Sequence, residues 1–242
     1  MRKGSWALAG LAAFVTAGSA SAVDIGVPGL ELNLTLLLES EHRLRGVTLT
    51  DGDPRLTGTA ELAHESGLYG NVRLANVDFN DPTDLELSFT GGYRQTIDRF
   101  SYDANIAYFT YPDAPDGADY DYVEFAFEPS YDAGPVILSG EIAWSPDYFG
   151  SSDDSLYLEG GITVPLDFGT DSVAVALFGT LGYSYFSDGG VPDYLNWTLG
   201  ASATLAPFTL SVSYEDTDLA GQGFSCDDIC DETVLVSLTT TF

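Results

Sequence analysis

Hydrophobic and polar positions alternate with a period of two through most of this chain. In the last stretch, residues 231–242, Val234 and Val236 fall on one face, while Ser237 and Thr239 fall on the other. Alternation of this kind predicts a β-strand with one apolar face. Eleven earlier stretches repeat the pattern. The twelve predicted strands are 30–39, 55–62, 68–74, 85–94, 102–108, 122–128, 136–144, 156–164, a stretch starting at 173, 195–202, 208–213 and 231–242.

Short and longer connections alternate between these strands along the whole chain. The short ones are 65–67, 96–98, 131–135, 165–171 and 206–207. The longer ones, rich in Asp, Gly and Pro, are 46–54, 78–84, 111–121, 145–154, 186–193 and 215–232. Membrane barrels have short turns at one end and longer loops at the other, whereas a soluble sandwich or lipocalin-like barrel has no reason to keep this parity. We therefore predict an all-β fold: a transmembrane antiparallel up-and-down β-barrel of about twelve strands.

The last strand has a specific role in such a barrel. An unpaired strand edge is not tolerated inside a membrane, so the strand ending at Phe242 is expected to pair with the first strand and close the wall. A C-terminal strand that ends in Phe also resembles the assembly signal of outer-membrane barrels. Tyrosine and tryptophan near the strand ends would form interfacial girdles.

The first residues read as a secretory leader. Arg2 and Lys3 precede an apolar core, and Ala20-Ser21-Ala22 forms a cleavage site. An N-terminal membrane anchor is the alternative, but the core is short and ends in small residues. The expected organisation is a signal peptide at 1–22 followed by a barrel at 23–242.

Charge narrows the functional classes. The chain has 37 acidic and 8 basic residues, for a net charge of −29, and its one lysine lies in the leader. Such a chain could not neutralise phosphates, so nucleic acid is excluded as a partner. The six longer loops carry 21 acidic residues and no Lys or Arg. These loops could gather divalent cations, or they could serve general solvation in a salty habitat, and both readings stay open.

Charged residues also recur on the strand faces that we assign to the barrel interior. Glu31 and Glu128 are among them. These charged residues could form a constriction of opposed charges that orients solutes, or a salt-bridge network that fills the lumen. If the lumen is open, its excess of acid predicts a preference for cations. The candidate pore-lining residues are Arg43, Arg45, Arg55, Arg73, Arg94, Glu39, Glu41, Glu61, Glu86, Asp103, Glu124, Glu141 and Glu159.

Residues 40–79 carry a recognisable block of motifs. It contains an Arg-x-Arg-Gly segment, an Asp-Gly-Asp-Pro loop, a His-Glu-Ser-Gly turn and an Asn-Val-Asp-Phe strand end. This block resembles the start of the TorF-type porins of Gram-negative outer membranes, with Glu41 and His42 in place of an Asp-Tyr pair. The late cysteine pair and the terminal Phe also agree with that family. The resemblance implies an outer-membrane barrel with a pore function and no particular solute.

Cys226 and Cys230 are expected to form a small disulfide that pins the last long loop, because the chain is exported. A metal site there would need two more ligands, and neither histidine is placed near it. His64 is expected at a turn and His42 within the first strand near Glu41, and no serine stands in a nucleophile motif, so no catalytic site, enzyme activity or cofactor is expected.

The sequence thus favours an outer-membrane porin with a narrow, cation-preferring pore for small solutes. The alternative is a non-conducting structural or adhesin-like barrel that acts through its acidic loops. The expected partners are outer-membrane lipid, small solutes or cations, and the barrel-assembly machinery, which would recognise the strand ending at Phe242.

Overall fold

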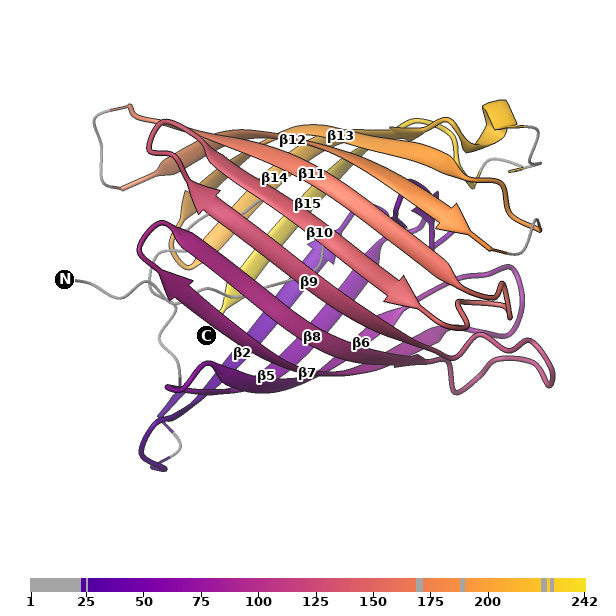
Figure 1. The fold of residues 1–242 in the computed structure, drawn as a ribbon, viewed down its shortest axis with the longest axis horizontal. Helices are drawn as coiled ribbons and strands as arrows, with labels where there is room; N and C mark the ends of the chain where they lie inside the picture. The colour runs from indigo at the N-terminus through magenta and orange to yellow at the C-terminus, as the bar shows by residue number, and fades with distance from the viewer. Residues whose placement is uncertain (1–22, 25, 169–171, 188–189, 223–225, 227–228) are drawn as a thin grey trace.

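The computed structural model describes residues 23–24, 26–168, 172–187, 190–222, 226 and 229–242, which form a closed antiparallel barrel (Figure 1). The predicted leader, 1–22, lies outside the described residues. Within the described chain, twelve long strands make the wall, and β1, β3 and β4 are two-residue strands. The strands are β1 (Val23–Asp24), β2 (Leu30–Glu39), β3 (Arg43–Leu44), β4 (Val47–Thr48), β5 (Arg55–His64), β6 (Leu68–Asn76), β7 (Leu85–Ile97), β8 (Phe100–Thr110), β9 (Tyr122–Asp132), β10 (Ile137–Ser145), β11 (Ser155–Leu166), β12 (Ala174–Phe186), β13 (Tyr194–Leu205), β14 (Phe208–Thr217) and β15 (Thr233–Thr241).

The barrel closes where β15 pairs with β2. Thr241 lies opposite Thr35, and the ladder continues from there to the end of β2. Past the ladder, the Phe242 N–H donates to the Leu34 carbonyl at 2.8 Å, and the Leu34 N–H donates back at 3.0 Å. On its other side β2 pairs with β5 along its whole length. The predicted pairing of the last strand with the first is therefore confirmed, as are all twelve predicted strands.

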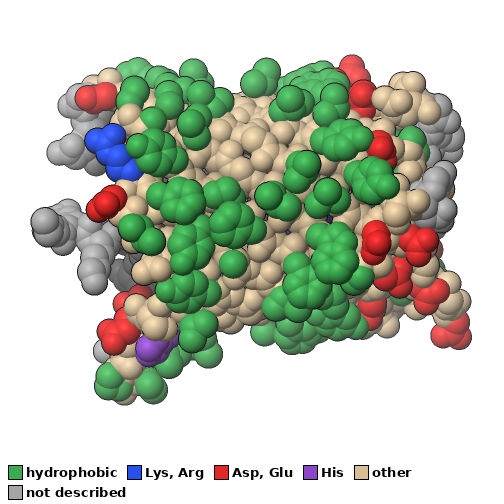
Figure 2. All heavy atoms as spheres, viewed as in Figure 1, with side chains coloured by type: hydrophobic (Ala, Val, Ile, Leu, Met, Phe, Trp, Pro, Cys, Tyr) green, Lys and Arg blue, Asp and Glu red, His purple; other side chains and the backbone are tan. Residues whose placement is uncertain are grey.

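Large apolar side chains cover the outside of the wall (Figure 2). Leu199 on β13 is 63% exposed and Leu56 on β5 is 57% exposed. The alternate residues point inward and are mostly polar, charged or small, as with Arg55, which is fully buried. The strand period thus gives one apolar and one polar face, as a barrel in lipid requires.

The two ends of the barrel differ in the length and charge of their connections. Short turns such as 65–67 and 206–207 lie at the end that also holds the start of β2 and Phe242 (Figure 1). The longer connections lie at the opposite end, where acidic side chains gather in Figure 2. The predicted asymmetry is confirmed.

Helix plays a minor part. The described residues contain a 3-10 helix, Leu219–Gln222, near the end of β14. No helix in this described part of the chain is long and apolar enough to cross a membrane.

A charge on the outer face should destabilise the barrel in lipid. We expect Leu199→Arg, near the middle of β13, to lower the free energy of unfolding by about 2–4 kcal/mol, because lipid cannot solvate the guanidinium. Urea unfolding in liposomes, followed by tryptophan fluorescence, measures the change. Thr198→Arg is the matched control, since Thr198 faces the lumen on the same strand. Equal losses from both substitutions would contradict this assignment of the faces.

Candidate functional site

The first long connection folds into the barrel instead of away from it. β2 ends at Glu39, and residues 40–50, which we call the luminal hairpin, contain the paired strands β3 and β4. Arg45 and Gly46 form the turn between them, with φ of 54° and 84°. Two consecutive positive φ values are typical of a two-residue hairpin turn, and the glycine adopts this conformation without strain.

Arg45 reaches across the lumen from the tip of this hairpin. Its Nη2 lies 2.7 Å from Glu124 Oε2 on β9 and 3.7 Å from Glu141 Oε1 on β10. The guanidinium also lies over the Tyr157 ring of β11, 4.3 Å from the ring centroid. In the ring of strands, β10 stands opposite β2, where the hairpin begins. The luminal hairpin therefore spans the interior and narrows it.

This arrangement corrects part of the sequence interpretation. Glu41, Arg43 and Arg45 were expected on the inward face of the first strand, but that strand ends before them. They still enter the lumen, because the hairpin carries them there. In the sequence, the hairpin is indicated by the Arg45-Gly46 pair, which forms its two-residue turn. The alternation of residues on both sides of this pair resembles that of a continuous strand, so the turn was not predicted.

Other loops hold the luminal hairpin from several sides. The Thr48 N–H donates to the Ile229 carbonyl at 2.9 Å, and the Arg43 guanidinium donates to the Asp231 carbonyl. The Asp78 N–H donates to the Leu49 carbonyl at 2.9 Å.

The predicted disulfide is present and lies beside the hairpin. Cys226 and Cys230 are bonded and buried together with Tyr194 and Leu219. Val47 of the luminal hairpin packs against this cluster. The disulfide therefore restricts its own loop and also supports the luminal hairpin through the contact with Val47.

One wall of the lumen, built by β5, β6 and β7, carries paired arginines. Arg55 and Arg73 both donate to Glu86 Oε1, at 2.8 Å and 2.7 Å. The Arg55 side chain is completely buried and that of Glu86 is 2% exposed. Tyr111 adds a hydrogen bond to Glu86 Oε2 at 3.2 Å. One carboxylate thus compensates two guanidinium groups near the long-loop end.

A second pair lies deeper on the same wall. Arg94 donates to both carboxylate oxygens of Glu61, with Nη1–Oε2 at 3.1 Å and Nη2–Oε1 at 2.5 Å. Its guanidinium stacks on the Tyr69 ring at 4.5 Å, and the Tyr69 hydroxyl donates to Asp103 at 2.9 Å. At the end of β2, His42 Nδ1 of the luminal hairpin lies 2.9 Å from Glu39 Oε2.

The neighbouring wall, from β8 to β11, carries a row of acidic residues on four consecutive strands. Asp103 on β8 lies directly across from Glu128 on β9. Glu141 on β10 lies directly across from Glu159 on β11. The β9–β10 register, with Phe127 opposite Ile142, puts Glu128 beside Glu141. We call Asp103, Glu128, Glu141 and Glu159 the acidic row.

Hydrogen bonds to the acidic row come mostly from neutral groups, while Arg94 lies directly across from Asp103 and Arg45 lies 3.7 Å from Glu141. Asn105 donates to Asp103 at 3.0 Å and to Glu128 at 3.1 Å, and the Tyr157 hydroxyl donates to Glu159 at 2.8 Å. Like charges opposite one another on neighbouring strands repel, so this row lowers the stability of the wall and attracts positive charge. No group of three or more His, Cys, Asp or Glu side chains in the described chain is arranged to hold a metal ion.

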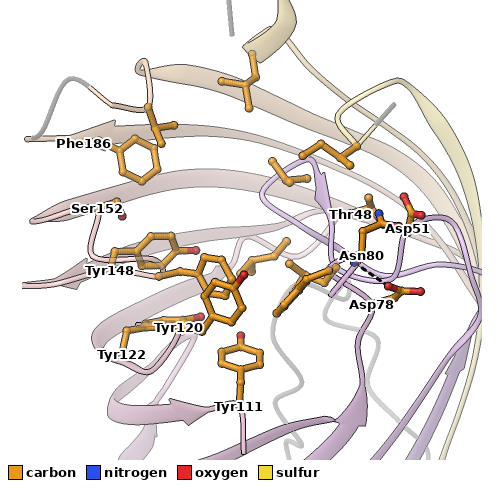
Figure 3. Close-up of a pocket in the computed structure, with 18 of the residues that line it drawn as sticks. Thr48, Asp51, Asp78, Asn80, Tyr111, Tyr120, Tyr122, Tyr148, Ser152 and Phe186 are labelled. Carbon is orange, nitrogen blue, oxygen red and sulfur yellow. Dashed lines mark hydrogen bonds between the residues drawn. The ribbon is translucent and has the colours of Figure 1, made fainter. Parts of the chain in front are cut away.

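An aromatic cavity of about 360 Å³ lies at the long-loop end, between the luminal hairpin and the other long loops (Figure 3). Tyr120 and Phe149 stack with their ring centroids 4.4 Å apart, and Phe79 meets Phe149 edge-on at 5.2 Å. Tyr111 and Tyr148 complete the aromatic side, and Leu44 and Val47 of the luminal hairpin form another. Burial raises the pKa of the Tyr148 hydroxyl, which therefore stays protonated at neutral pH. The sequence analysis did not predict this cavity. The feature that could have indicated it is the set of aromatic residues among the acidic residues of the long loops.

The two walls should respond differently to loss of a carboxylate. We expect Glu86→Gln to lower the free energy of unfolding by about 3–5 kcal/mol, because it leaves buried Arg55 without a counter-ion. Glu159→Gln, the matched substitution in the acidic row, should instead be neutral or stabilising by about 0.2–1 kcal/mol, because it relieves repulsion from Glu141. Urea unfolding in detergent micelles measures both. A larger loss for Glu159→Gln than for Glu86→Gln would refute the division into two walls.

Comparison with solved structures bears on the fold. The barrel is similar to the KdgM porin with a TM-score of 0.58 and 8% sequence identity, covering 87% of this chain and 99% of that one. A structure of the KdgM porin in complex with disordered oligogalacturonate gives the same values. The NanC porin matches with a TM-score of 0.52 and 10% identity, over 87% of this chain and 98% of that one. The shared feature is the twelve-stranded fold.

Comparison of sequences identifies the family. No curated protein matches the chain. A family described as "Bacterial protein of unknown function (Gcw_chp)" matches residues 20–242, which covers the whole barrel. The chain therefore belongs to the Gcw_chp family of bacterial proteins.

Proposed function

We propose that this protein is an outer-membrane porin whose narrow lumen passes small solutes with a preference for cations. The acidic row carries the proposal, because four carboxyl groups on neighbouring strands, whose hydrogen bonds come mostly from neutral groups, would give the lumen a negative potential. The porin folds of KdgM and NanC support the general class. The resemblance of residues 40–79 to TorF-type porins supports it independently.

The arginines on β5, β6 and β7 make the electrostatic potential in the lumen uneven from one part of the wall to the next. Arg55, Arg73 and Arg94 lie on β5, β6 and β7, while the acidic row lies on β8 to β11. A solute in the lumen therefore meets a stretch of positive groups beside a stretch of negative groups, and the field between these adjacent stretches would orient dipolar and charged solutes. Most of the arginine charge is already compensated by Glu61 and Glu86, so the net field favours cations.

The proposed solutes differ from the ligand named with KdgM. Oligogalacturonate is a polyanion, and the acidic row would repel it at close range. The luminal hairpin further limits passage to small molecules, because Arg45 ties its tip to Glu124 on the far wall.

Delivery to the membrane is part of the same proposal. Residues 1–22 would act as a signal peptide and be removed on export. The barrel-assembly machinery would then recognise β15, which ends beside Phe242, and outer-membrane lipid would surround the apolar wall.

A specific observation also favours the alternative of a non-conducting barrel. The luminal hairpin is bonded to the loop that holds Ile229 and Asp231, to Asp78, and to Glu124 on the far wall. A hairpin held from so many sides could close the lumen, and the acidic loops would then carry the function.

Channel recordings decide between these functions. We expect the refolded protein to give discrete conductance steps in a planar bilayer, with a cation-selective reversal potential under a KCl gradient. Glu141→Gln combined with Glu159→Gln should reduce the cation preference at least threefold, because it removes half of the acidic row. Glu65→Gln, in an exposed turn outside the lumen, is the matched control. A correctly folded but silent barrel would favour the non-conducting function, and anion selectivity would refute the role of the acidic row.

The hairpin can be tested separately. Arg45→Ala removes the bonds to Glu124 and Glu141, so the tip is freed from the far wall and the single-channel conductance should rise at least twofold. Arg99→Ala, at an exposed turn, is the control. An unchanged conductance in Arg45→Ala would show that the hairpin does not limit passage.

A further inference from the structure

We propose that the aromatic cavity at the long-loop end is a binding site for an organic cation, that is, a substituted ammonium group attached to an apolar body. The cavity is lined by Tyr111, Tyr120, Tyr148, Phe149, Leu44 and Val47, with Asp51 and Asp78 at its rim (Figure 3). It lies outside the acidic row and does not depend on whether the lumen conducts.

Size and lining set the apolar part of the ligand. A volume of about 360 Å³ is in the range of small-molecule sites, which are mostly apolar with a few polar groups. Phe149 offers its ring between Phe79 and Tyr120, and Leu44 closes the side formed by the luminal hairpin. A ring or a branched hydrocarbon would be desolvated on several sides here, which favours binding.

The hydroxyl groups of two lining tyrosines are already used as donors. Tyr120 donates to Asp81 at 2.8 Å, and Tyr111 donates to Glu86 at 3.2 Å. A phenol that donates to a carboxylate has an electron-rich ring and oxygen, and it offers no proton to an anion. Both features favour a cation over the ring faces.

Charge around the cavity has the same sign. The charged residues that line it, Asp51 and Asp78, are acidic and exposed, and they lie on the side of the cavity away from Tyr120 and Tyr148 (Figure 3). Arg45 lies 5.6 Å from the Tyr148 centroid, but its charge is compensated by Glu124 and Glu141. The acidic loops around the cavity would concentrate cationic ligands at the entrance.

Calorimetric titration of the protein in detergent micelles tests the site directly. The probes are benzyltrimethylammonium, benzyl alcohol and benzenesulfonate, which share a ring and differ in charge. We expect the ammonium compound to bind at least tenfold more tightly than the alcohol, with an affinity that falls as salt rises. No binding of the ammonium compound, or equal binding of the sulfonate, would overturn the proposal.

Variants separate the ring and charge contributions. Phe149→Leu keeps an apolar side chain but removes a ring face, and we expect it to weaken ammonium binding at least fivefold. Asp51→Asn combined with Asp78→Asn should weaken it severalfold and reduce its salt dependence. Phe168→Ala and Asp98→Asn, both exposed at the short-turn end, are the matched controls. Full binding in the cavity variants, or equal losses in the controls, would refute the site.

Binding and conduction are measured in different experiments. Because calorimetry requires no open pore, a silent barrel that binds the ammonium probe would refute the porin and keep the cavity site. A conducting barrel that fails to bind the probe would do the reverse.

Discussion

The structure depends on the pairing of every strand edge in the wall. A backbone N–H or C=O left open to lipid costs several kcal/mol, so the sheet must close on itself. β15 meets this requirement by pairing with β2, and the mutual hydrogen bonds of Leu34 and Phe242 extend that seam to the last residue. Once the ring is closed, the strand period leaves one face of each strand for lipid and the other for the lumen.

In the closed barrel, charged side chains face the lumen, and the arginines of the wall and the acidic row lie on different strands. Arg55, Arg73 and Arg94 occupy neighbouring strands and share Glu86 and Glu61 as counter-ions, so most of the arginine charge on this wall is compensated. The next strands along the wall, β8 to β11, have carboxylates beside carboxylates, and part of the compensation comes from Arg45 on the luminal hairpin. Repulsion within the acidic row opposes folding, so this part of the wall is held less favourably than the strands that carry the arginines.

The luminal hairpin links the lumen to the long-loop end. Its tip contacts the acidic wall, its strand β4 contacts the disulfide loop through Ile229, and its apolar residues Leu44 and Val47 line the aromatic cavity. A displacement of the luminal hairpin at one of these three places would therefore alter its contacts at the other two. The Cys226–Cys230 bond strengthens this connection, because it restricts the loop against which the hairpin rests.

The sequence alone determined the number of strands, their faces and the closing pair, because a strand in lipid must alternate and the alternation of residues such as Leu34 and Leu36 is local. It also indicated that Arg55 and Glu86 point inward. The path of residues 40–50 was beyond it, because a two-residue turn at Arg45-Gly46 follows the same alternation as a continuous strand. Only the tertiary structure showed that Arg45 meets Glu124, that Asp103 and Glu159 belong to one row, and that the loop aromatics enclose a cavity. These contacts join residues far apart in the chain, and they depend on the strand register and the loop paths, which no local pattern encodes.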